Sequence, residues 1–160
     1  MKPMRGNKTT KASLTTVTVA QQALKILADD YNAGRPATTY GELARRCGYA
    51  VGQNVQWMGQ VTQLIDIACA LADVPSFALV RVCTKKNGKI NDDSWRTGEY
   101  ADLRNKIIAR AQSPEGWTDD DFERISNGLA YFSAHALGNK KAWAYVRGQI
   151  NVEDWARGPR

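Results

Sequence analysis

Amide side chains gather in one short stretch of the chain. Gln and Asn donate and accept hydrogen bonds at the same time, which is the chemistry that reads the edges of nucleic-acid bases. The amides in question are Gln53, Asn54, Gln56 and Gln60. Trp57 stands among them, and an aromatic ring beside cations can stack on a base. The same pattern is also typical of a solvated helix face with a core tryptophan, so both interpretations stay open.

Basic side chains flank this stretch. The chain carries 22 basic and 16 acidic residues, a formal net charge of +6. Residues 1–11 hold four basic and no acidic residues, residues 35–89 hold seven basic and three acidic ones, and residues 90–160 are nearly balanced. Localised positive charge is the usual footprint of a polyanionic partner, although a solubilised turn and a loose tail would look the same. The cations that we predict to contact phosphate are Arg45, Arg46, Arg81, Lys85, Lys86 and Lys89.

The elements that must position these side chains follow from the apolar periodicity. Helical spacing predicts helices over residues 17–32, 40–47 and 53–72. Residues 77–83 are rich in β-forming side chains and predict a strand, and Asn87-Gly88 predicts a tight turn into a returning strand near residues 89–92. Three helices followed by a hairpin with a basic tip is the order of a winged helix-turn-helix. In such a module the third helix enters a groove of DNA and cations of the wing meet phosphates.

Further helices are expected in the second half of the chain. Apolar spacing predicts a helix over residues 100–112 and another over residues 118–136, while residues 141–155 are helical or irregular. The fold class is therefore mainly α with a small β-hairpin, a winged helix-turn-helix plus C-terminal helices. We expect a disordered basic arm over residues 1–16, a winged-helix domain over 17–95, and a C-terminal helical segment over 96–160 packed on it.

Residues 38–44, Thr-Thr-Tyr-Gly-Glu-Leu-Ala, carry a resemblance to a known family. They are similar to the Thr-Thr-Tyr-Gly-Glu-Ile-Ala motif of O6-alkylguanine-DNA alkyltransferases and alkyltransferase-like proteins. The resemblance covers residues 20–92, a little under half of the chain. It implies a DNA-binding winged helix in which Tyr40 helps to rotate a nucleotide out of the duplex, although a tyrosine at the start of a helix is equally typical of a core residue. Gln56 stands where the family has the arginine that fills the resulting gap.

The catalytic motif of that family, Pro-Cys-His-Arg, is absent from this chain. Leu79 stands at the nucleophile position, and Cys83 follows later without the His-Arg pair, so that Arg81 alone corresponds. Alkyl transfer needs an activated thiolate, so we expect none here. A weaker similarity links the Tyr-Gly-Glu-Leu-Ala pattern to small modules of mobile elements.

Other groups that could do chemistry have simpler explanations. Asp119, Asp120 and Asp121 are consecutive in the first turn of an expected helix, where they complement its dipole and point in different directions. The lone histidine, His135, is expected to be structural. We therefore expect no enzyme, no metal site and no cofactor.

The cysteines and the hydropathy bear on the location of the protein. Cys47, Cys69 and Cys83 form no Cys-x-x-Cys pair, which favours reduced thiols and a cytoplasmic protein over a disulfide framework. No apolar stretch approaches the roughly 18 residues that cross a bilayer, so we expect no membrane partner.

Three functions remain as hypotheses. The first is a non-catalytic DNA-binding protein that uses its third helix and basic wing, with duplex DNA as the expected ligand. The second is a mobile-element protein-interaction factor that inhibits a host nucleoprotein or defence complex through its C-terminal segment. The third is a nuclease or a toxin.

Overall fold

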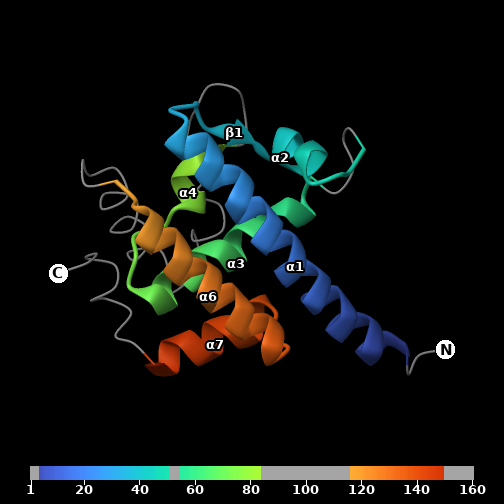
Figure 1. The fold of residues 1–160 in the computed structure, drawn as a ribbon. Coiled ribbons are helices and arrows are strands. Elements are labelled where there is room, and N and C mark those ends of the chain that lie inside the picture. Colours follow the sequence, from blue (N-terminus) through green and yellow to red (C-terminus); the bar gives the residue numbers. More distant parts are fainter. Residues whose placement is uncertain (1–3, 51–54, 84–115, 150–160) are drawn as a thin grey trace.

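The computed structural model describes residues 4–50, 55–83 and 116–149, and helices dominate it (Figure 1). This confirms the expectation of a mainly α fold. A two-stranded sheet of very short strands accompanies the helices. In chain order the elements are α1 (Met4–Asn32), β1 (Thr38–Thr39), α2 (Tyr40–Arg46), α3 (Trp57–Ala72), α4 (Ala78–Arg81), β2 (Val82–Cys83), α6 (Asp119–Ala134) and α7 (Asn139–Gln149).

Three long helices enclose the core. α1 and α6 lie side by side, α3 packs against both, and α7 packs on α3 (Figure 1). Apolar residues recur at helical spacing in α1 and α6 and turn one face of each helix inward, whereas α3 is buried on nearly all sides from Val61 to Ala70. The largest fully buried side chains of these three helices are Val17 and Leu27 of α1, Met58, Leu64, Ile65 and Ile67 of α3, and Ile125, Leu129 and Phe132 of α6.

The first helix is longer than its apolar pattern predicts. We expected a disordered arm over residues 1–16, but α1 begins at Met4 and continues without a break to Asn32. The residues from Val17 onward are held by burial, and once a helix is nucleated each further residue adds a hydrogen bond at little cost. No proline interrupts residues 4–32. The basic residues Arg5, Lys8 and Lys11 therefore belong to a helix.

Side-chain caps begin two of the other helices. The Thr39 hydroxyl accepts a hydrogen bond from the Glu42 N–H at 3.1 Å, which starts α2 where the sequence predicts it. Thr118 and Asp121 form a reciprocal capping box at the start of α6. α3 begins at Trp57 rather than at residue 53, with Gln56 at its cap position.

Residues 77–83 differ from the expected strand. Residues Ala78–Arg81 form the short helix α4, and only Val82 and Cys83 are extended. The buried Asp66 carboxylate accepts a hydrogen bond from the Ala78 N–H at 3.0 Å and so caps the first turn of α4. The residue types of 77–83 alone do not predict this helix. β2 then pairs in parallel with β1, Thr38 opposite Val82. The rest of the expected wing and the helix expected over residues 100–112 lie outside the described residues.

Aromatic rings tie α1, α4 and α6 together. Tyr31, Phe77, Trp117 and Phe122 pack edge to face, with ring centroids 4.8–6.0 Å apart. The Trp117 N–H donates to the Tyr31 hydroxyl at 3.1 Å, and the Arg81 guanidinium lies over the Tyr31 ring. In the part of the chain that the structure describes, no helix has both the length and the apolar character needed to span a membrane.

Candidate nucleic-acid interface

The start of α3 presents two of the predicted amides to solvent. Gln56 and Gln60 are both exposed. Trp57 between them is half-buried, since its indole N–H donates to the Thr16 hydroxyl at 3.2 Å and its ring meets Tyr49 edge to face. Trp57 therefore joins α3 to α1 and to the loop after α2. Gln53 and Asn54 lie outside the described residues.

The first turn of α7 is held beside these amides. The Asn139 amide donates to the Gln60 carbonyl at 2.7 Å and to the Gln63 side-chain oxygen at 2.9 Å. The next two residues, Lys140 and Lys141, are exposed. Sequence reasoning missed these lysines, because only the packing of α7 on α3 brings residue 140 next to residue 60. The one local signal was the run Asn-Lys-Lys itself.

Arg45 and Arg46 are neighbours on α2 with different surroundings. Arg45 is exposed and pairs with Glu42, its Nε 2.9 Å from one carboxylate oxygen. Arg46 is drawn inward to the buried carboxylate of Asp30 on α1, which also binds Arg35. The hydrogen bonds from Arg46 lower the pKa of Asp30. Arg45 is thus free to reach a ligand at the expense of a surface pair, whereas Arg46 joins two helices.

Arg81 and Tyr40 also contact other parts of the protein. Arg81 donates from Nη2 to the Arg35 carbonyl at 2.6 Å, and burial lowers its pKa. Tyr40, the first residue of α2, is only 8% exposed and packs in the core with Leu43 and Ala44. The structure therefore brings together Gln56 and Gln60 but not Tyr40, Arg46 or Arg81 as exposed groups. Lys85, Lys86 and Lys89 lie outside the described residues.

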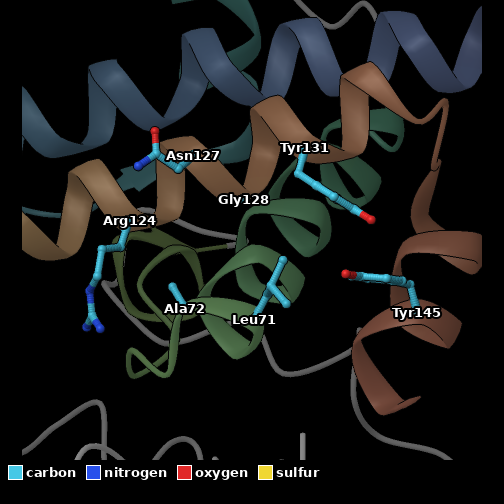
Figure 2. A pocket seen from close by; sticks show the side chains of 7 residues that line it. All are labelled: Leu71, Ala72, Arg124, Asn127, Gly128, Tyr131 and Tyr145. Atoms are coloured by element: carbon cyan, nitrogen blue, oxygen red, sulfur yellow. The ribbon is translucent and has the colours of Figure 1, made fainter. Parts of the chain in front are cut away.

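A pocket of about 270 Å³ opens between α3, α6 and α7 (Figure 2). Tyr131 of α6 and Tyr145 of α7 form one wall, their rings stacked at 5.0 Å with 27° between the planes. Figure 2 shows their hydroxyl groups pointing toward each other, and the hydrogen bond between them raises the pKa of Tyr131. The lining residues are Leu71, Ala72, Arg124, Asn127, Gly128, Tyr131 and Tyr145.

Reactive groups are few in the described part of the chain. Within it, no three His, Cys, Asp or Glu side chains gather as metal ligands would. Burial raises the pKa of Cys47, and raises that of the fully buried Cys69 well above its usual value. Both thiols are therefore poor nucleophiles at neutral pH. The Ser76 hydroxyl is fully buried and has no hydrogen-bond partner among the described residues.

Comparisons of this chain with family models, with curated proteins and with solved structures found no match. The function must therefore be argued from the geometry of the chain itself.

Proposed function

We propose that this chain is a non-catalytic DNA-binding protein whose contact surface is centred on the start of α3. The observation that carries the proposal is the pair of hydrogen bonds from Asn139, which hold the exposed lysines of α7 beside the exposed amides of α3. Amides can read base edges while cations meet phosphates, and DNA-binding surfaces combine the two.

The distribution of charge along the helices supports this placement. Lys140 and Lys141 lie beside the start of α3, whereas the exposed Asp119 and Asp120 lie at the start of α6. That end of α6 adjoins the far end of α1, where the Asn32 amide donates to Asp119. A polyanion approaching the start of α3 would therefore meet lysines before it meets the aspartates of α6.

The basic turns of α1 and the wing would extend the surface. The Trp57 indole contacts Thr16, and the turns of α1 that precede Thr16 carry Arg5, Lys8 and Lys11. The turns of α1 that lead up to Thr16 can add phosphate contacts, as can the lysines of the expected wing. Each phosphate contact steepens the fall of affinity with salt.

The test is a titration of labelled duplex DNA with the protein, followed by fluorescence anisotropy at several salt concentrations. We expect binding at low salt that weakens steeply as salt is raised. Gln60→Glu puts a carboxylate at the centre of the surface and should weaken binding about tenfold, the effect of losing one good contact to a base. If duplex DNA and single strands both fail to bind at low salt, the proposal is wrong and a protein partner takes precedence.

Two matched variants control for charge and for folding. Gln22→Glu makes the same chemical change at an exposed position of α1 and should leave binding nearly unchanged. Gln56→Glu places an acid at the cap of α3, where a negative charge favours the helix, and yet should weaken DNA binding. Loss of binding by Gln56→Glu with an unchanged melting temperature would therefore report the interface rather than the fold.

A further inference from the structure

The two tyrosines that form one wall of the pocket each have a neighbour one helical turn away. Tyr131 and His135 are four residues apart on α6, and Lys141 and Tyr145 are four residues apart on α7, so each pair shares one face of its helix. The tyrosines of the two pairs stack on each other, and His135 stacks on Tyr131 at 3.9 Å. A column of aromatic rings thus lies beside the pocket, with a lysine one helical turn away.

The connection between the two helices holds this arrangement in place. The Leu137 N–H donates to the Phe132 carbonyl at 2.8 Å, and Ala136 adopts a left-handed conformation with φ of 53°. This is the hydrogen bond and backbone pattern of a tight helix end. Asn139 then fixes the start of α7 on α3. The rings are therefore positioned before any ligand arrives, which lowers the entropy lost on binding.

The pocket suits one flat ring system. Leu71, Ala72 and Gly128 give it an apolar lining, while the tyrosine hydroxyls and Asn127 supply polar groups. A Cβ atom on Gly128 would approach the Ala68 Cβ to 3.3 Å, so the close packing of α6 on α3 leaves little room for a side chain at position 128. The volume of about 270 Å³ lies just below the range of about 300–1,000 Å³ that holds drug-sized ligands.

The charges at the two ends of the pocket differ. At one end Arg124 lies 3.6 Å from Asp120 and 3.4 Å from Asp121, so its charge is already balanced. On the side of Tyr145, Lys141 lies one turn earlier on α7 and is exposed. An anionic group is therefore favoured on the lysine side, and an uncharged ring within the pocket.

We infer that this pocket binds one unpaired base of a single-stranded nucleic acid, with the adjoining phosphates along Lys140 and Lys141. Stacking on aromatic side chains tolerates any base, because every base has a π face. The inference rests on the proposed function and deepens it, since the two lysines belong to both surfaces. It adds a preference for unpaired strands, which duplex DNA cannot satisfy.

The experiment compares two labelled probes of equal length and charge, an oligothymidylate and an abasic oligonucleotide, by fluorescence anisotropy with the full chain. The unaltered protein should bind the oligothymidylate about tenfold more tightly, which is the effect of stacking one base. Tyr145→Leu should abolish this preference, and Tyr145→Phe, which keeps the ring, should retain it.

A second variant tests the pocket without removing the ring. Ala72→Phe fills the lined space and should also abolish the preference for the oligothymidylate, while thermal unfolding confirms that the variant is folded. Equal affinity of the unaltered protein for both probes would overturn this inference but leave the proposed function standing. Absence of salt-sensitive binding to duplex DNA and to either probe would overturn both.

Discussion

Arg46 of α2 donates from both terminal nitrogens to both carboxylate oxygens of Asp30 on α1, at 2.5 and 3.0 Å. Paired hydrogen bonds of this kind fix orientation as well as distance. The Asp30 side chain is only 4% exposed, and Arg35 supplies a further hydrogen bond at 3.0 Å. The contact therefore joins α2 to α1 through two hydrogen bonds at one point.

Asp30→Asn should destabilise the fold. The amide would keep the shape of the side chain but leave the partly buried Arg46 without its counter-ion, and hydrogen bonds to charged groups contribute about 1.5–3 kcal/mol. We expect the free energy of unfolding at pH 7 to fall by about 2 kcal/mol, measured by urea denaturation. Glu42→Gln breaks the exposed pair with Arg45 and should lower it by less than about 1 kcal/mol. Equal losses in the two variants would contradict this ranking.

The same carboxylate should make stability depend on pH in acid. Its arginine partners lower the pKa of Asp30 below the usual value of 3.8, so the folded state binds the proton more weakly than the unfolded chain. This stabilisation is complete above the unfolded pKa and is lost as pH falls through the lower folded pKa. The stability gap between the unaltered protein and Asp30→Asn should hold constant from about pH 7 to 5 and shrink below about pH 4. A gap that widens in acid would refute the assignment.

The thiols should react in a fixed order. Burial raises the pKa of both Cys47 and Cys69, and Cys69 is fully enclosed while Cys47 is half-buried. Because the thiolate is the reactive species, a disulfide reagent at pH 8 should modify Cys47 slowly and Cys69 only in urea. Peptide mass mapping after timed quenching reports each site separately. Rapid labelling of Cys69 in buffer would show that α3 opens readily.

Two helical glycines should respond in opposite directions to a larger side chain. A Cβ on Gly59 of α3 would meet no atom within 4 Å, so Gly59→Ala should stabilise the protein by up to about 1 kcal/mol through helix propensity. Gly128 packs against Ala68, so Gly128→Val should destabilise it by about 1–3 kcal/mol by forcing α6 away from α3. The melting temperatures of the two variants check both signs. If both variants raise or both lower the melting temperature, the contact between Gly128 and Ala68 is not what restricts the side chain at position 128.

Local chemistry was enough to predict several elements. The apolar spacing of α3 and the Thr118 cap of α6 act within a few residues, and the structure has these helices close to their expected positions. Residues 77–83 were predicted wrongly because β-forming side chains dominate them. The buried Asp66 that accepts from Ala78 comes from another helix, and a propensity for strand is readily overridden by such a contact.

The candidate interface shows the same division between local and distant contacts. The amides of α3 could be found because four of them occur close together in the sequence. The partner of Arg46 could not, since Asp30 is 16 residues away and on another helix. The approach of residue 140 to Gln60 could not be predicted either, because it depends on the hydrogen bonds that Asn139 of α7 makes to α3.

Tyr31 touches the chain on both sides of residues 84–115. Arg81 lies over its ring, and the Trp117 N–H binds its hydroxyl, so one side chain anchors both the exit and the return of that stretch. A single side chain of α1 therefore holds Arg81 and Trp117 at the same place on the bundle, so the loss of the Tyr31 ring and hydroxyl would loosen both contacts at once.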